Sequence, residues 1–381
     1  MEDFVIVAAR RTPQGRFLGA LAGLSPVDLA CAAAAPAVEV VGAAAIGQVI
    51  LGNVLSAGHG MNVARQVGVR LGIDPAVPAF TVNMMCGSGL QAIRLAAQAI
   101  RTGEATAVLC GGTESMSTAA YLLPRVRRGL KLGDAAVVDS LLCDGLVDAF
   151  DGRHMGLQVE DLAAEYSISR ADQDAWAAAS QRRYGAAADR GAFAAEIVPV
   201  AGLAADEHPR PQTTAADLAA LKPAFQATGS VTAGNSSGLN DGAAVVVLAA
   251  RSAAERAGWP VLCRWTDSVA VGCEPRRMGL GPVHALRALA ARQGRAVADL
   301  GDFEINEAFA AQVLACLAML DLDHDRVNRD GGAIALGHPI GASGGRLVVH
   351  AANRIAAGEA DRLAAALCVG GGMGVACLLE S

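Results

Sequence analysis

The chain has 381 residues, of which 53% are hydrophobic and 18% are charged, and it carries a net charge of −6. A chain this apolar can bury a large core, so it is not intrinsically disordered, and its length predicts two or three core regions. The acidic balance without a long basic run excludes nucleic acid as a partner, and the apolar stretches are too short or too interrupted to span a bilayer.

The first part of the chain alternates short apolar runs with longer alanine-rich stretches. We expect strands at residues 4–9, 48–52, 79–83 and 107–111, and helices at residues 26–35, 60–71 and 89–102. This alternation is typical of a mostly parallel sheet wrapped by helices, so it predicts an α/β fold. The first apolar run is too short for the apolar core of a signal peptide, and the expected location is therefore the cytoplasm.

A different kind of sequence occupies residues 118–238, which are richer in charge and in proline. Amphipathic helices are expected at residues 159–166 and 170–190, and Ser169 with Asp172 resembles a capping arrangement at the start of the second. We interpret this region as an inserted lid domain that holds the bulk of a ligand.

The alternation of the first part returns toward the end of the chain. We expect strands at residues 261–272, 303–306, 327–328 and 364–369, and helices at residues 283–292, 307–320 and 341–357. A weak internal repeat relates residues 81–112 to residues 327–371, which predicts two similar halves. Ligands in open α/β sheets bind at strand ends, so two facing halves would bring their strand ends to one shared centre. On this interpretation the centre contains Cys86, His338 and Cys368.

Cys86 stands between a predicted strand and a predicted helix. A side chain on such a turn is pushed outward, as in a nucleophile elbow, and the amides of the first helical turn favour a thiolate. The alternative is a buried cysteine at a tight turn. Gly87 and Gly89 favour the nucleophile, because glycine beside a reactive side chain lets the backbone approach a substrate closely.

The other two residues of this centre are also framed by glycine. Pro339 restricts His338 to extended backbone, and the histidine is either a loop residue bonded to the backbone or, with Cys86, the base that activates the thiol. Cys368 is either a core cysteine or part of a site in which the glycine amides that follow it contribute to an oxyanion hole.

Asn306 ends one predicted strand and precedes a predicted helix. It is either the N-cap of that helix or an amide that fixes a water or polarises a carbonyl. The remaining histidines lack the spacing of metal ligands, and the glycine runs lack the features of nucleotide-binding loops, so no metal and no tightly bound cofactor are expected. Small core residues are expected at the other cysteines: Cys31, Cys110, Cys143, Cys263, Cys273, Cys316 and Cys377.

Six segments of the sequence carry a resemblance to a known family. They are residues 82–89, 111–117, 231–242, 306–310, 331–344 and 368–374. In this order they resemble the thiolases of the biosynthetic acetyl-CoA acetyltransferase type, essentially from end to end. The resemblance implies an α/β fold of the thiolase type, in which two similar mixed-sheet halves form a layered αβαβα core. The implied domains are an N-terminal half at residues 1–117 plus 239–261, an inserted loop domain at residues 118–238 and a C-terminal half at residues 262–381.

The resemblance also implies a ping-pong Claisen reaction that interconverts two acetyl-CoA with acetoacetyl-CoA and CoA. Cys86 is then the acylated nucleophile, His338 activates it, and Cys368 removes the α-proton of the second acetyl-CoA. Asn306, through a water, and His338 bind the enolate oxygen, while the amides of Cys86 and Gly370 hold the tetrahedral intermediate. The implied CoA contacts are Arg210, Phe225, Ser237 and Met278, with His154 and Met155 at the pantetheine end.

Two local features refine the expected substrate and assembly. Residues 154–156 resemble short-chain thiolases, and residues 125–148 resemble the loop through which such thiolases form homotetramers, as dimers of dimers. The alternatives are a degradative thiolase for longer 3-ketoacyl-CoA, also in fatty acid metabolism, and a non-catalytic acyl-CoA-binding protein of the same fold. Asp217 departs from the small polar residue usual in the family, and residues 200–222 are shorter than usual, which leads us to expect weaker binding of the anionic CoA.

Overall fold

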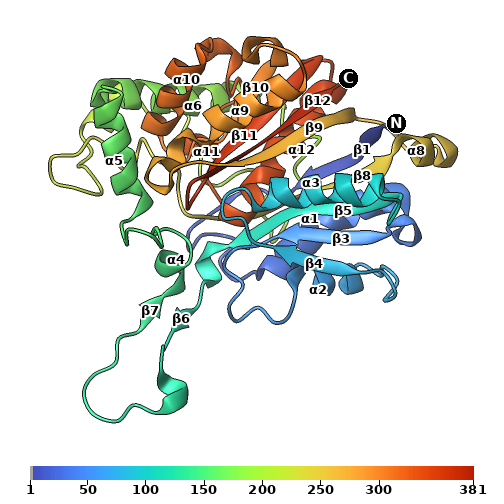
Figure 1. Ribbon diagram of the computed structural model, residues 1–381, viewed down its shortest axis with the longest axis horizontal. Helices are drawn as coiled ribbons and strands as arrows, with labels where there is room; N and C mark the ends of the chain where they lie inside the picture. Colours follow the sequence, from blue (N-terminus) through green and yellow to red (C-terminus); the bar gives the residue numbers. More distant parts are fainter. Residues whose placement is uncertain (1–2) are drawn as a thin grey trace.

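The computed structural model, which describes residues 3–381, contains one continuous sheet whose two halves form separate layers (Figure 1). Helices lie between these two layers and on the outer side of each, so the fold has five layers. The strand order is β10-β11-β12-β9-β1-β8-β5-β3-β4, and the short β2 (Gly15–Arg16) pairs with β8. The two halves of the sheet meet where β1 pairs with β9 over three residue pairs, from Phe4 with Trp265 to Ile6 with Cys263. This arrangement confirms the predicted α/β fold with two mixed-sheet halves.

The N-terminal half of the sheet carries its outer helices on one face. Its strands are β1 (Phe4–Arg11), β3 (Gln48–Gly52), β4 (Ala79–Val82), β5 (Ala107–Ser115) and β8 (Asn240–Ala250). The pairs β3–β4 and β3–β5 are parallel, whereas β8 is antiparallel to both β1 and β5. The outer helices are α1 (Pro26–Val41) and α2 (Val63–Arg70), which pack on this face through a buried apolar cluster.

The C-terminal half repeats this plan. Its strands are β9 (Cys263–Gly272), β10 (Asp302–Ile305), β11 (Arg362–Val369) and β12 (Met373–Glu380). Only β10 and β11 pair in parallel. Its outer helices are α9 (Gly281–Arg292) and α10 (Ala310–Leu320), which share a second buried cluster with the strands. The short α8 (Arg251–Ala257) lies between the halves in the chain.

The middle layer consists of α3 (Ser88–Arg101) and α12 (Ile340–Ala356), and its apolar side chains meet strands of both halves. The two helices pack closely because glycines face each other. A Cβ atom on Gly89 would stand 2.7 Å from the amide nitrogen of Gly345 and 3.0 Å from the carbonyl oxygen of Gly341. These helices directly follow Cys86 and His338 in the chain, so their contact fixes the distance between the two motifs.

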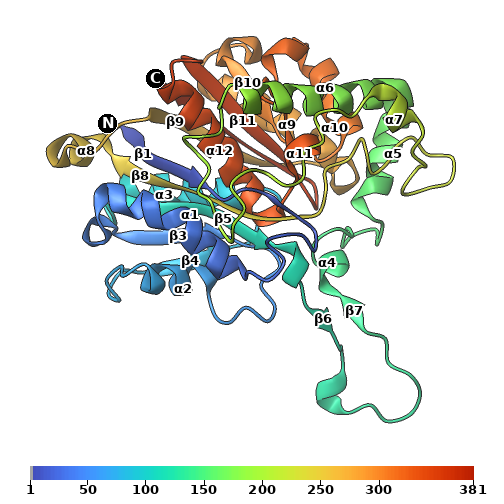
Figure 2. The same ribbon diagram turned by 180° about the vertical axis from the view of Figure 1, so that it is seen from behind.

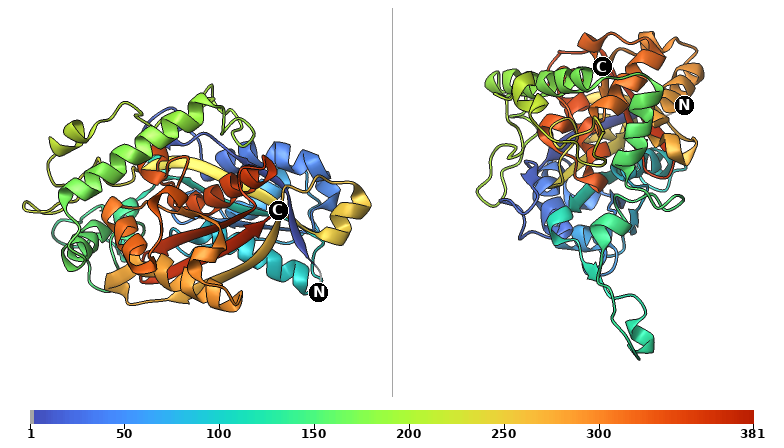
Figure 3. Two further views of the ribbon diagram at one scale, coloured as in Figure 1. Left: turned by 90° about the horizontal axis from the view of Figure 1, so that it is seen from above. Right: turned by 90° about the vertical axis from the view of Figure 1, so that its left-hand side faces the viewer.

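Residues 118–238 form helices and loops outside the sheet. Their helices are α4 (Ser140–Cys143), α5 (Met155–Glu165), α6 (Arg170–Asp189) and α7 (Ala215–Ala219), and α6 has the predicted capping box of Ser169 and Asp172. Figure 2 shows α6 along the C-terminal half, where it contacts α10 and α11 (Ala333–Leu336). A ribbon of β6 (Tyr121–Leu122) and β7 (Val138–Asp139) carries a loop that projects far from the body (Figure 3).

A buried network of charges joins residues 190–206 to α12 and to both halves of the sheet. Arg11 of β1 contacts Glu196 at 2.7 Å and Asp206 at 2.6 Å. His350 of α12 lies 3.1 Å from the other oxygen of Glu196 and 3.2 Å from Asp330. Opposite charges therefore meet across the packed interior, where each needs a partner to remain ionised.

Some expected elements differ from the structure. The expected strand at residues 327–328 is a single bridge between Val327 and Phe303, because Asn328 has a left-handed backbone with φ of 49°. The expected helix at residues 307–320 begins only at Ala310, with Phe309 as its N-cap. Among the other cysteines, Cys143 is exposed and Cys31 and Cys273 are half-buried, so these three are not the core residues expected, whereas the remaining four are buried.

Candidate active site

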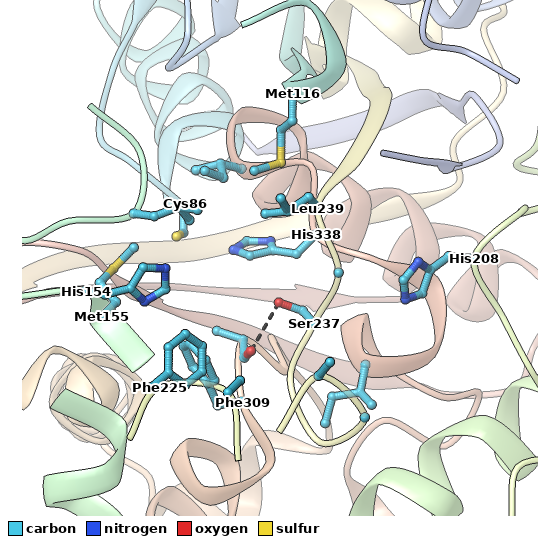
Figure 4. A pocket seen from close by; sticks show the side chains of 18 of the residues that line it. Cys86, Met116, His154, Met155, His208, Phe225, Ser237, Leu239, Phe309 and His338 are labelled. Carbon is cyan, nitrogen blue, oxygen red and sulfur yellow. Dashed lines mark hydrogen bonds between the residues drawn. The ribbon is translucent and has the colours of Figure 1, made fainter. Parts of the chain in front are cut away.

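One cavity of about 690 Å³ lies where the two halves and the inserted region meet. Cys86, His338 and Cys368 all line it, as the internal repeat predicts. Figure 4 shows the sulfur of Cys86 pointing into the cavity beside the imidazole of His338, with His154 and Met155 on the other side of the sulfur.

A strained turn presents the thiol of Cys86. Met85 has a left-handed backbone with φ of 47°, which is unfavourable for a side chain of this type. Asn83 supports the turn by accepting a hydrogen bond from the Met85 amide at 3.0 Å. The Ser88 hydroxyl accepts from the Met84 amide at 2.8 Å and donates to the Met85 carbonyl at 2.6 Å. The helix α3 begins at Ser88, so Cys86 stands on the expected turn between a strand and a helix.

The surroundings of Cys86 keep its sulfur protonated at rest. The side chain is 5% exposed, and burial raises the pKa of the thiol to about 11. Main-chain amides of Gly370 and of Cys86 itself hydrogen-bond to the sulfur and lower the pKa, while the nearby carboxylate of Glu114 raises it. A thiol in this state needs a base to become a nucleophile.

His338 lines the same cavity, and its hydrogen bonds define which of its ring nitrogens is basic. The Ser343 hydroxyl donates to the carbonyl of Pro339 at 2.9 Å, so at 2.5 Å it must accept from Nδ1 of His338. Nδ1 therefore carries the proton, and Nε2 keeps a free lone pair without a hydrogen-bond partner among residues 3–381. Burial, with a smaller effect of Arg346, lowers the pKa of His338 to about 4, so the ring is neutral at neutral pH.

Cys368 supplies a second buried thiol to the same cavity. It lies near the end of β11 and is 1% exposed. Burial, together with the proximity of Cys86, raises the pKa of this thiol well above its usual range. A thiol of this kind holds its proton firmly, and its thiolate is a correspondingly strong base.

Asn306 lies directly after β10, two residues before the cavity-lining Ala308, and is fully buried. Its main-chain amide donates to Ala366 at 2.9 Å, but neither side-chain amide atom has a hydrogen-bond partner in the described chain. It is not the N-cap of α10, which excludes one of the two sequence interpretations. A buried amide without protein partners is costly, which points to a functional role. Neither Asn306 nor Gly370 is among the cavity-lining residues of the part of the chain described.

The six residues expected to contact CoA all line the cavity. His154 is the N-cap of α5, and its Nδ1 accepts a hydrogen bond from the Gly156 amide at 3.0 Å. Its ring stacks on Phe225 with 4.7 Å between centroids. The Ser237 hydroxyl donates to the carbonyl of Ala308 at 3.1 Å (Figure 4). The remaining three are Met155, Arg210 and Met278.

Comparison with known proteins gives these features a family. Residues 4–252 match the thiolase N-terminal domain, and residues 259–381 match the thiolase C-terminal domain. The chain belongs to the thiolase family. It is 48% identical to an acetyl-CoA acetyltransferase of Pseudomonas aeruginosa, over 100% of this chain and 99% of that protein. It is 46% identical to an acetyl-CoA acetyltransferase of Escherichia coli, with the same shares covered.

Solved thiolase structures have the same fold over the full chain. The Bacillus anthracis acetyl-CoA acetyltransferase superposes with a TM-score of 0.97 and 39% identity, over 100% of this chain and 99% of that one. The human mitochondrial 3-ketoacyl-CoA thiolase in complex with CoA superposes with a TM-score of 0.97 and 41% identity, over 100% and 98%.

Sequence reasoning missed several residues of this thiolase site. Ser343 and Asn240 hold His338, and the Asn240 side chain accepts from the His338 amide at 3.0 Å. His208 lines the cavity and is half-buried, two residues before Arg210. The position of Ser343 in the first turn after the glycine-framed histidine was a usable signal. The fold brings Asn240 and His208 to the site, and no local sequence pattern indicates either residue.

Proposed function

We propose that the chain is an acetyl-CoA C-acetyltransferase, which interconverts two acetyl-CoA with acetoacetyl-CoA and CoA through an acyl-cysteine. The observation that carries the proposal is the shared cavity of Cys86, His338 and Cys368, in which a neutral imidazole and a main-chain amide face a protonated thiol. Covalent capture by a thiol divides one difficult transfer into two easier ones.

In the first half-reaction, Nε2 of His338 takes the proton of Cys86, and the thiolate attacks the thioester carbonyl of acetyl-CoA. The negative oxygen of the tetrahedral intermediate accepts hydrogen bonds from the amides of Cys86 and Gly370, which already face the sulfur. The C–S bond to CoA breaks, and the CoA thiolate takes a proton from Cys368. The products are acetyl-Cys86, CoA, a protonated His338 and a Cys368 thiolate.

In the second half-reaction, the Cys368 thiolate removes the α-proton of a second acetyl-CoA. The enolate oxygen is held by protonated His338 and, through a water, by the otherwise unpartnered amide of Asn306. The enolate carbon attacks acetyl-Cys86, acetoacetyl-CoA leaves, and the Cys86 thiolate recovers its proton from His338. The high pKa of Cys368 suits this step, because a weakly acidic thiol gives a strong base.

The binding of CoA is assigned to the outer part of the cavity. His154, Met155, Phe225 and Met278 form an apolar wall, whereas Arg210 and His208 bring polar groups. We assign the apolar wall to the pantetheine arm and Arg210 to the charged end of CoA. CoA thioesters are then substrates, and no tightly bound cofactor is required. Asp217 lines the same cavity, so its negative charge weakens the binding of this anionic ligand.

The acyl chains of the substrates are proposed to be short. A degradative thiolase for longer 3-ketoacyl-CoA is the second candidate, and the structural likeness to the human 3-ketoacyl-CoA thiolase supports it. The two differ in kcat/KM across acyl chains of increasing length, and a preference for long chains contradicts the short-chain proposal. A non-catalytic acyl-CoA-binding protein is the third candidate, and binding without turnover would establish it.

We further propose a homotetramer, a dimer of dimers, that acts in the cytoplasm in fatty acid metabolism. The loop between β6 and β7 supports the assembly, because Leu123, Leu130, Leu132 and Val137 expose large apolar side chains there. No helix among residues 3–381 has the length and apolarity that a membrane crossing requires. The three domains are proposed as expected from the sequence, with the inserted loop domain at residues 118–238.

Incubation with acetyl-CoA tests the proposal. Intact-mass measurement and peptide mapping should find one acetyl group on Cys86, and Cys86→Ala should carry none. Cys110→Ala is the matched control, because it removes another buried cysteine from β5, outside the cavity lining. A protein that turns over acetoacetyl-CoA without an adduct on Cys86 would refute the mechanism.

A further inference from the structure

Glu114 is a buried carboxyl group that has no part in the steps above. It lies near the end of β5, and its side chain is fully buried. Among residues 3–381, no arginine, lysine or histidine forms an ion pair with it, and the charged group that affects its pKa is another carboxyl group, Asp241. A buried carboxyl group without a cation must be held by hydrogen bonds, and it persists only where it has a purpose.

Four N–H groups converge on Glu114 from two segments. Its Oε1 accepts from the side-chain amide of Asn53 at 2.7 Å and from the main chain of Leu55 at 3.1 Å. Its Oε2 accepts from the main chain of Val54 at 3.0 Å and from the main chain of Gly341 at 2.9 Å. An ionised carboxylate can accept all four, and no other side chain of this length can.

The carboxylate thereby joins the turn that follows His338 to a segment that packs against Cys86. Val54 and Leu55 belong to a small apolar cluster that also contains Cys86 and Ile340. Gly341 lies in the first turn of α12, three residues after His338, where Glu114 acts as a cap from a distant strand. A shift of this turn would move Nε2 of His338 relative to the sulfur of Cys86.

The charge of Glu114 also reaches the nucleophile. It raises the pKa of the Cys86 thiol, in addition to the larger effect of burial. Burial raises the pKa of Glu114 itself to about 7, against the hydrogen bonds from Leu55, Val54 and Gly341 that lower it, and Asp241 of β8 raises it further. Cys86, His338 and Cys368 are titratable groups that line the nearby cavity, whereas Asp241 acts on Glu114 from β8.

We infer that Glu114 is a positioning residue, which clamps the first turn of α12 to residues 53–55 and so fixes His338 against Cys86. Its negative charge adds to the larger effect of burial, which disfavours the thiolate of Cys86. This role rests on the proposed acyl transfer at Cys86.

Two variants separate the effect of the side-chain length of Glu114 from the effect of its charge. Glu114→Gln keeps the length, but its NH₂ group must face two N–H donors, so two hydrogen bonds are lost together with the charge. Glu114→Asp keeps the charge but is one methylene shorter. Both should lower kcat by about 10²-fold with KM within about twofold of wild type, because the CoA-binding wall is untouched.

Alkylation by iodoacetamide measures the pH at which the thiol of Cys86 becomes reactive. This pH would not change if Glu114 had only a structural role. Across a pH series, Glu114→Gln should shift the midpoint of alkylation to lower pH, because a nearby negative charge is removed. Glu114→Asp should keep the wild-type midpoint. The control is Asp267→Asn on β9, which removes another buried carboxylate, one paired with Arg292, outside the cavity lining.

The outcomes distinguish this inference from the proposed function. Alkylation uses no acyl-CoA, so an unshifted midpoint in Glu114→Gln overturns the electrostatic role even if the wild type accepts no acetyl group. A wild type that is alkylated at Cys86 but never acetylated contradicts the proposed function alone. A kcat of Glu114→Asp within twofold of wild type overturns the clamp, and this variant carries the test by itself if Glu114→Gln does not fold.

Discussion

The basic nitrogen of His338 is set by groups on the far side of its ring. Ser343 has one hydroxyl proton and gives it to the Pro339 carbonyl, so it can only accept from the imidazole. Burial holds the ring neutral, and the Asn240 side chain fixes the backbone that carries it. The protonation and the position of this ring therefore depend on Ser343 and Asn240, which lie outside the cavity lining.

Asn306 allows function and stability to be separated by a single substitution. Its side-chain amide has no hydrogen-bond partner in the described chain, so Asn306→Ala removes no protein hydrogen bond. We expect an unchanged or higher Tm together with a loss of kcat of about 10²-fold, because a donor to the enolate oxygen is lost.

The control for this prediction is Asn328→Ala, measured by thermal unfolding and steady-state kinetics. The Asn328 amide donates to Ile305 at 2.8 Å and to Glu307 at 2.9 Å, so its removal should lower Tm by several degrees. A similar loss of Tm in Asn306→Ala would show that Asn306 is structural.

At the scale of elements, the contact between α3 and α12 couples the two catalytic motifs. A Cβ on Gly89 meets backbone atoms of α12 rather than a flexible side chain, so the helices must separate to accept it. Gly89→Ala should therefore destabilise the protein by about 1–3 kcal/mol and lower kcat, since Cys86 moves away from His338.

Urea unfolding and kinetics of Gly89→Ala check this prediction against Gly23→Ala. A Cβ on Gly23 meets nothing within 4 Å, so that variant should keep wild-type stability and kcat. Wild-type kcat in Gly89→Ala would show that the helix contact does not control the distance between the motifs.

The sequence predicted most strands of the large sheet and the helices that pack on it, but it missed β8, β12 and the two-residue strands β2, β6 and β7. Asn240–Ala250 is buried along its whole length between β1 and β5, so it shows no alternation, and an apolar run of this kind cannot be distinguished from a buried helix. The start of α10 was misplaced because Glu307 accepts hydrogen bonds from Trp176, Ser180 and Ile334, which keep residues 306–309 out of the helix.

In the site, too, residues within a local sequence pattern were predictable, and residues brought together only by the fold were not. Cys86, His338 and Cys368 were predictable because their glycine-rich surroundings are contiguous in the chain. Glu114 was not assigned a role, because its partners are residues 53–55 and Gly341, which the fold alone brings together.

At the scale of the whole molecule, a buried histidine makes stability depend on pH. Burial alone lowers the pKa of His350, but Glu196, Asp330 and Glu304 raise it to about 9, above its ordinary value of 6.5. The folded state thus binds this proton more tightly than the unfolded state. The stabilisation is complete below the unfolded pKa and is lost as pH rises through about 9.

His350→Gln should therefore be less stable than the wild type near neutral pH, and this difference in stability should shrink at high pH. The difference in free energy of unfolding between wild type and variant, from urea titrations, should shrink by on the order of 3 kcal/mol between about pH 6 and about pH 10. The thiols and Tyr184 are present in both proteins, so their contribution to the pH dependence of the free energy of unfolding cancels in this difference. A constant difference across this range would contradict a charged His350, and the exposed His284→Gln serves as the control.

The central claim is that the two cysteines of the cavity have unequal tasks. Cys368→Ser keeps the shape of the site but replaces the proton-transferring thiol by a far weaker acid. A CoA thiolate can leave as the anion and take its proton from water, so this variant, incubated with acetyl-CoA, should still gain one acetyl group on Cys86 by intact mass and peptide mapping. It should form no acetoacetyl-CoA, because it lacks the base for the α-proton. Loss of acetylation and condensation to the same extent would contradict the division of labour between Cys86 and Cys368.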